Sequence, residues 1–218
     1  MCFGVLTASS SAETSTFTGK VYCNTGDNVA LFYPQQEVPT QGTNRGKFTI
    51  SLNGQDGKLE TIAKKFHYVY GVATVTSVTE STANATINNM QSLLAVCKFT
   101  FVDETNAPIP VKTLTVNYYD NRFGSSLGYP LTATLTPTAD VGSLAYPVQG
   151  DDNWSDNGLS IVLESETSDG VYVALFPYSL TGYLHFSVTN SSGTYTGTAK
   201  ATLNAGNYYP VTLKLNKL

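Results

Sequence analysis

The chain has 218 residues and a net charge of −4, and charged residues make up only 13% of it. Because Lys and Arg do not cluster, no part of the sequence would neutralise several phosphates, which excludes a nucleic-acid partner. No apolar run is long enough for a membrane-spanning helix, and the first residues have neither the basic nor the apolar region of a signal peptide.

The composition favours β-structure. Hydrophobic residues make up 41% of the chain, which includes 14 Tyr and 10 Phe. The polar residues are mainly Thr, Ser, Asn and Gly, and β-branched and aromatic side chains pack well on half-buried pleated strands. The same bias is common in extracellular β-sandwich proteins, so we expect an exported, all-β protein whose export segment precedes Met1.

Predicted strands follow one another along the chain. Runs of alternating apolar and polar residues, bounded by turn residues, lie at 17–23, 29–33, 47–52, 67–76, 85–90, 93–102, 112–119, 131–136, 158–163, 171–176, 182–188, 195–200 and 208–215. Asn53 and Gly54, which follow one of these runs, predict a hairpin turn. Gly71, inside another, predicts a bulge. Residues 55–65 hold one helical turn at most.

The polar segment 103–110 is the best linker candidate, because it carries two prolines and separates two strand-rich halves. The length of the chain also fits two domains of about 100 residues each. Short, closely spaced strands indicate sandwiches rather than a parallel α/β fold. We therefore predict two tandem β-sandwich domains, at residues 1–106 and 107–218.

The sequence offers little for catalysis. Its two histidines, His67 and His185, lie in or beside alternating strands, and no HExxH, GxSxG or CxxC motif occurs. Glu164 and Glu166 alternate along one strand, where a polar outer face explains them better than a catalytic carboxylate pair does. We predict a protein that is not an enzyme and uses no cofactor.

Acidic residues concentrate in one loop, at Asp151, Asp152 and Asp156. They are a weak calcium candidate, because their spacing does not match the EF-hand loop and a solvated loop is the simpler interpretation. No other metal site is predicted. Trp154, the only Trp, lies in the same loop and is a candidate ligand contact if its indole is exposed. The alternative is that Trp154 covers the end of a sandwich.

The three cysteines, Cys2, Cys23 and Cys97, have spacings unlike any metal motif. Cys97 lies in an apolar run and is expected to pack as a small hydrophobic residue. A disulfide between Cys23 and Cys97 stays open as an alternative.

The strands themselves are candidates for the functional element. A sandwich with an exposed edge offers a row of unpaired N–H and C=O groups, and an extended segment from a neighbouring chain can complete it. Residues 211–215 and 14–21 are the segments that we expect nearest to such an edge.

The order of segments along the chain resembles the fimbrillin family of outer-surface proteins from the Bacteroidetes. The segments that carry the resemblance are 12–21, 27–34, 90–101, 111–116, 171–177, 184–189 and 200–213. The resemblance implies two transthyretin-like Greek-key β-sandwich domains in an exported lipoprotein of the outer membrane or fimbrium. It also implies a type V pilus subunit or cell adhesion protein, whose partners are other pilus subunits, host surface proteins or glycans.

The chain departs from the family pattern at both ends. The family's leading strand and Arg-containing cleavage site would lie before Met1, so the first domain is expected to lack its first strand. Arg45 is expected to be an exposed turn residue. Because no donor extension follows the last strand, we expect a tip or accessory subunit that associates by strand complementation. A carbohydrate-binding surface lipoprotein, using Trp154 and exposed tyrosines, is the alternative.

Overall fold

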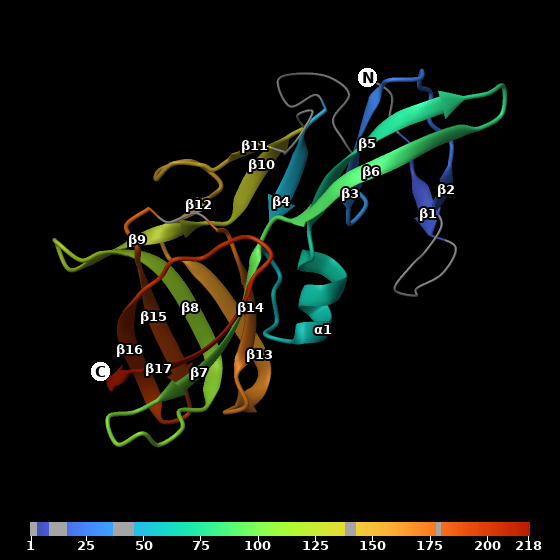
Figure 1. Ribbon diagram of the computed structural model, residues 1–218. Coiled ribbons are helices and arrows are strands. Elements are labelled where there is room, and N and C mark those ends of the chain that lie inside the picture. Colours follow the sequence, from blue (N-terminus) through green and yellow to red (C-terminus); the bar gives the residue numbers. More distant parts are fainter. Residues whose placement is uncertain (1–3, 9–16, 37–45, 138–142, 178–179) are drawn as a thin grey trace.

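The computed structural model describes residues 4–8, 17–36, 46–137, 143–177 and 180–218, and almost all of its regular structure is β-sheet (Figure 1). The first elements are β1 (Leu6–Ala8), β2 (Phe17–Gly19), β3 (Asn28–Tyr33), β4 (Phe48–Ser51), α1 (Leu59–Thr61), the π-helical turn η1 (Ile62–Phe66), β5 (Val69–Val78) and β6 (Ala83–Ser92). The later elements are β7 (Ala95–Val102), β8 (Val111–Asp120), β9 (Ser125–Pro130), β10 (Thr132–Thr136), β11 (Ser143–Ala145), β12 (Trp154–Ser155), β13 (Leu159–Thr167), β14 (Val171–Leu175), β15 (Tyr183–Asn190), β16 (Gly193–Lys200), β17 (Tyr208–Lys214) and β18 (Asn216–Lys217). The all-β prediction is confirmed. Within the described residues, no helix is long and apolar enough to cross a membrane.

Two sheets packed face to face form the larger part of the molecule. One sheet has the strand order β12-β9-β8-β15-β16-β18, with β13 also paired to β8, and the other has the order β14-β7-β17. The rings of Phe99 on β7 and Phe186 on β15 lie 5.0 Å apart between the two sheets. Both rings are buried, and the removal of such apolar side chains from water is the main force that holds the sandwich together.

β7 lies between two strands from later in the chain. It pairs antiparallel with β14 on one side and parallel with β17 on the other, where Val96 lies opposite Tyr208. A domain boundary at residue 106 would separate β7 from both of these partners. The division into 1–106 and 107–218 stays a prediction.

Residues 103–110 connect β7 in one sheet to β8 in the other. The Asp103 carboxylate accepts hydrogen bonds from the N–H groups of Thr105 and Ala107 at 2.8 and 2.9 Å, and from the Thr105 hydroxyl at 2.7 Å. A bridge between Val102 and Pro108 lies beside this turn. The segment that we expected to be a linker therefore forms a tight, hydrogen-bonded turn between β7 and β8.

A smaller group of strands comes from the first half of the chain. β3, β5 and β6 form an antiparallel sheet, and β1 and β2 pair only with each other among the described strands. Phe32 of β3 stacks on Phe48 of β4 with ring centroids 4.3 Å apart. This contact ties the sheet to the rest of the molecule.

β4 pairs with β10 rather than with the strand that follows it in sequence. The hairpin predicted at Asn53 and Gly54 is therefore wrong. The chain does turn there, but it then runs along the outer edge of β14, where the Tyr172 N–H donates to the Gly57 carbonyl at 2.9 Å, and enters α1 and η1. These two consecutive elements have three and five residues, so the helical segment is longer than the one turn at most that we expected in 55–65.

Candidate functional site

The β5–β6 hairpin projects away from the sandwich (Figure 1). Its turn is closed by hydroxyl side chains and main chain together, because the Thr79 N–H donates to the Thr82 carbonyl at 2.8 Å and the Thr82 N–H donates to the Thr79 hydroxyl at 3.1 Å. The pairing of the two strands contains two register shifts, and such shifts increase local twist. In the first shift Val72 pairs with Asn89 and Ala73 with Ile87, so the extra residue lies in β6. Gly71 pairs regularly with Met90, and the bulge predicted there is wrong.

β6 is an edge strand. It pairs with β5 on one side, and no strand in the described part of the chain pairs with its other side. Wherever the exposure of a β6 side chain is described, that side chain is exposed, except for the half-buried Ser92. Such an edge presents N–H and C=O groups that a further strand can pair with.

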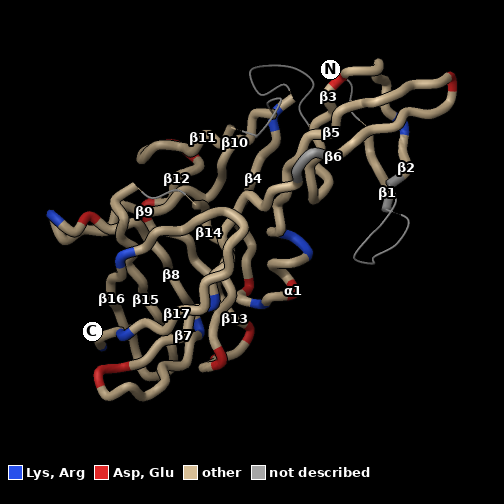
Figure 2. The backbone as a smooth tube through the Cα atoms, viewed as in Figure 1, with Lys and Arg blue, Asp and Glu red and all other residues tan. Residues whose placement is uncertain are grey.

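The composition of β6 leaves this edge unguarded, by which we mean that it lacks the Lys or Pro that natural proteins place on free edges. The ten residues of Ala83–Ser92 include no charged residue, no Pro and no Gly. Glu80, in the turn, is the only charged residue between positions 69 and 92. Figure 2 shows this contrast, with acidic colour only at the far end of the hairpin.

One face of the β3-β5-β6 sheet is apolar next to this edge. The side chains that share this face across the three strands are Val29, Leu31, Ala73, Ile87 and Met90. Ile87 is 47% exposed and Met90 is 42% exposed. The free edge therefore adjoins apolar surface that a partner's side chains could cover.

β17 has a guarded edge in the same molecule. The prediction that 211–215 lies near a sheet edge is confirmed, because β17 is the outer strand of its sheet. The Asn207 carbonyl and the Leu215 N–H both bond to β7, so the main-chain groups of the even-numbered residues between them point outward. Pro210 holds one of these outward positions without an N–H, and Lys214 places a charge at another.

Trp154 is buried rather than exposed, which corrects its interpretation as a candidate ligand contact. Only 8% of the surface of Trp154 is exposed to solvent. The indole N–H donates to the Leu127 carbonyl at 3.0 Å, and the indole ring lies 6.2 Å from the Tyr118 ring. Trp154 therefore covers one end of the sandwich, and its ring face cannot stack on a sugar.

The described side chains of the acidic loop do not converge on one point. Among the described residues, no three His, Cys, Asp or Glu side chains gather closely enough to hold a metal ion, so Asp151, Asp152 and Asp156 are not brought together. The Asp151 carboxylate instead accepts a hydrogen bond from the Val148 N–H at 2.9 Å. It stabilises its own turn.

Neither histidine lies beside an acid. His67 Nε2 lies 3.2 Å from the Ser92 hydroxyl, and His185 Nδ1 lies 3.4 Å from the Ser126 hydroxyl. Within the described residues, neither imidazole forms an ion pair with a carboxylate. Burial lowers the pKa of His185, because the charged imidazolium is poorly solvated there. These contacts lack the acid of a Ser–His–acid triad.

Glu164 and Glu166 have separate structural partners. Glu164 pairs with Lys58 Nζ at 3.0 Å. The Glu166 carboxylate accepts hydrogen bonds from the N–H and the hydroxyl of Ser191 at 2.6 and 3.1 Å. The two side chains therefore do not act as a pair.

Cys23 and Cys97 are both free thiols, so the disulfide between them is not formed. Cys97 is fully buried on β7 and packs as a hydrophobic residue, as expected. Burial raises the pKa of its thiol to about 12. Arg45 and residues 14–16 lie outside the described residues.

No protein-family model matches the sequence, and a comparison with curated protein sequences gave no match. Solved structures do show similarity. A candidate cell adhesion protein from Bacteroides uniformis superimposes with a TM-score of 0.57 at 13% identity, covering 96% of this chain and 78% of that one. Another from Bacteroides ovatus gives a TM-score of 0.52 at 15% identity, covering 86% of this chain and 62% of that one. At such identities the likeness shows a shared fold, which is consistent with the fimbrillin-like resemblance of the sequence.

Proposed function

We propose that this chain is a non-enzymatic adhesion or pilus subunit of the cell surface, which accepts an extended strand of a neighbouring subunit along β6. The observation that carries this proposal is the free, uncharged edge of β6, a ten-residue strand at the margin of its sheet. Strand addition at such an edge builds assemblies through main-chain pairing and needs no catalytic group.

The comparisons support a role in adhesion. The solved structures from Bacteroides uniformis and Bacteroides ovatus that share the fold are candidate cell adhesion proteins. The segment order that resembles the fimbrillins points to the same role. A location at the outer membrane or in a fimbrium, with a lipid anchor, belongs to this proposal.

The energetics suit a polymer contact. Each main-chain hydrogen bond of an added strand contributes about 0.5–1.5 kcal/mol net, so affinity would come from the sum along β6. Side chains at alternate positions of the added strand would cover Ile87 and Met90, which are partly exposed. The side chains at these alternate positions would therefore determine which partner strand binds.

The acceptor role suits a tip or accessory subunit. The strands at the C-terminal end of the described chain are already paired within the fold, β17 with β7 and β18 with β16. They are therefore not free to be donated to a neighbour. A subunit that used only an acceptor edge would end a chain of subunits.

Two tandem Greek-key sandwich domains belong to the same proposal. With the predicted division into 1–106 and 107–218, β7 of the first domain would pair with β14 and β17 of the second. β4 would then cross from the first domain to pair with β10 of the second.

The proposal is tested with a photo-crosslinking residue at Ala85 on β6, in cells that display the protein. The same residue at Thr212 on β17 is the matched control, because both positions are exposed on edge strands. We expect Ala85 to form adducts with an extended segment of another exported subunit, and Thr212 to form none. Equal yields of cross-linked adducts from both positions would contradict the proposal. It would also be contradicted if protease added to intact cells failed to cleave the chain.

A further inference from the structure

We infer that Gln55 guards the outer edge of β14, where its side chain takes the place of a missing strand and keeps this edge from pairing with a second copy of the chain. The inference does not depend on the proposed function, because it concerns a different sheet edge and involves no other subunit.

The Gln55 carboxamide pairs with Ala174 as the peptide group of a neighbouring strand would. The Ala174 N–H donates to Gln55 Oε1 at 2.7 Å, and Gln55 Nε2 donates to the Ala174 carbonyl at 3.0 Å. This reciprocal exchange is the pattern of a hydrogen-bonded pair in an antiparallel ladder. Gln55 Nε2 also donates to the Leu52 carbonyl at 3.2 Å, so both kinds of polar atom in the amide have partners.

The next outward-facing position of β14 is closed by main chain. The Tyr172 N–H donates to the Gly57 carbonyl at 2.9 Å, and Tyr172 and Ala174 are successive positions on the same side of the strand. Gly57 has a φ of +79°, and a Cβ there would lie 2.9 Å from the Val171 side chain. Glycine is therefore required for this close approach.

The sequence of β14 explains why this edge needs covering. Residues 171–176 read VYVALF, with no charge, no Pro and no Gly. Six-residue segments of high β-propensity and no charge are the ones that self-associate as stacked strands. β14 has neither the Pro nor the Lys found on β17, and the Gln55 side chain takes over their role.

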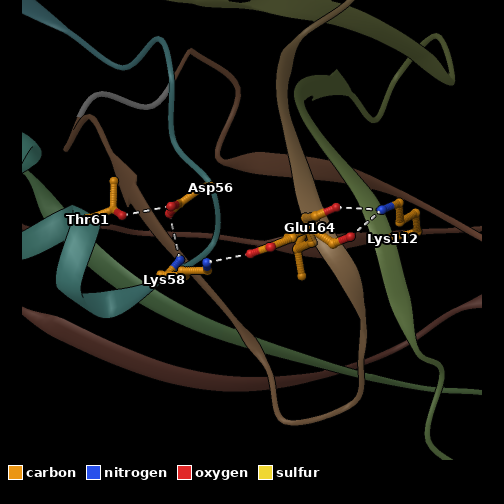
Figure 3. A network of polar contacts seen from close by, with 6 residues as sticks. Asp56, Lys58, Thr61, Lys112 and Glu164 are labelled. Atoms are coloured by element: carbon orange, nitrogen blue, oxygen red, sulfur yellow. Dashed lines mark hydrogen bonds and ion pairs between the residues drawn. The ribbon is translucent and has the colours of Figure 1, made fainter.

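The guarding segment is held at both ends. At one end, the Leu52 N–H bonds to a main-chain carbonyl just before β10 at 2.9 Å. At the other, the Asp56 carboxylate accepts from the Lys58 N–H at 3.0 Å and from the Thr61 hydroxyl at 2.8 Å. Lys58 Nζ then pairs with Glu164 on β13 at 3.0 Å (Figure 3).

Glu164 is fixed from its other side as well. Lys112 Nζ donates to the main-chain carbonyls of Leu163 and Glu164, each at 2.8 Å (Figure 3). The main chain at Glu164 is thus held by β8, the strand with which β13 pairs, and its exposed carboxylate is free to pair with Lys58.

The first test compares Gln55→Ala with Gln36→Ala by sedimentation velocity over a range of concentrations. Gln36 is the matched control, because its amide also donates to a main-chain carbonyl, that of Thr49 at 2.7 Å, but away from β14. We expect Gln55→Ala to self-associate about tenfold more tightly than the unchanged chain. Gln36→Ala should behave like the unchanged chain.

The second test is amide hydrogen exchange on the unchanged chain. We expect the Tyr172 and Ala174 amides to be protected and to exchange together as the guard opens, faster than the Val173 amide, which faces β7. In Gln55→Ala, protection of Ala174 should fall at least about tenfold while that of Val173 is retained.

Two results would overturn the inference. One is a folded Gln55→Ala variant that stays as monomeric as Gln36→Ala. The other is exchange of Tyr172 and Ala174 in the unchanged chain at the rate of unprotected amides, which decides the question even if Gln55→Ala does not fold.

Discussion

The side chain of Gln55 and the main chain of Ala174, 119 residues apart in the sequence, exchange two hydrogen bonds. They join the segment between β4 and α1 to the outer edge of β14. β6, another uncharged edge strand, has no such cover within the described residues. The fold thus closes one uncharged edge and leaves a second one open.

Ala85→Lys is expected to abolish strand addition at β6 without unfolding the chain. A Lys side chain on an edge strand obstructs further pairing, and a substitution at an exposed site changes the free energy of unfolding by no more than about 0.5 kcal/mol. The measurement is the yield of cross-links from a second β6 position, together with the thermal midpoint. Thr198→Lys on β16, also exposed, is the control, and an equal loss of yield in it would contradict the prediction.

Trp154→Phe is expected to destabilise the sandwich by about 1–3 kcal/mol, because the partly buried Leu127 carbonyl loses its donor. Urea unfolding followed by circular dichroism measures this loss. Tyr22→Phe, at a residue that is 87% exposed, should leave the midpoint unchanged. Because Trp154 is the only Trp, fluorescence gives an independent check, and native emission at the wavelength of a solvent-exposed indole would show the burial to be wrong.

Asp103→Ala is expected to destabilise the chain at neutral pH and to matter less in acid. The Thr105 hydroxyl and the Ala107 N–H lower the pKa of Asp103 below 3.8. The stabilisation is therefore complete above the unfolded pKa and is lost as the pH falls through the lower folded pKa. Unfolding midpoints of both chains across this range measure the effect, and a difference that is constant with pH would count against it.

Cys97 is expected to resist alkylation until the chain unfolds. Its thiol is fully buried and its pKa is raised to about 12, so almost no reactive thiolate forms. Cys23, which is half-buried, should react sooner in native protein. Mass-spectrometric mapping of alkylated peptides at increasing urea measures both rates. A linked Cys23–Cys97 peptide under non-reducing conditions would disprove the free-thiol assignment.

The sequence predicts most strands because alternation of apolar and polar residues is a local property. β3, β5, β7, β8 and β14 all lie within a few residues of the predicted ranges. The strands that were missed have weak local signals. β9 contains Gly128 and Pro130, while β11 and β12 have only three and two residues. β2 is shorter than the predicted 17–23, because only Phe17–Gly19 finds a partner in β1.

Strand partners were harder to predict, because pairing depends on residues far away in the sequence. The turn at Asn53 and Gly54 is real, yet Ser51 of β4 pairs with Thr132 of β10, 81 residues further along the chain. A turn signal predicts a change of direction and not which strand comes next. The parallel pairing of β17 with β7 has no local signal either.

The candidate site was only partly visible in the sequence. The stretch from 69 to 92 with Glu80 as its only charge was a usable signal for an unguarded hairpin. The burial of Trp154 was one of two interpretations that the sequence left open, because its loop is polar and the carbonyl that it meets belongs to Leu127 on another strand. Gln55 could not be singled out at all, since its partner Ala174 lies in a strand that only the folded chain brings near.

The parallel contact between β7 and β17 also constrains how the chain can be made. β7 ends at Val102 and its neighbour begins only at Tyr208, so the sheet cannot be completed until β17 has been synthesised. Such distant pairing slows folding. During that interval one edge of β7 has unpaired N–H and C=O groups, which other strands could pair with.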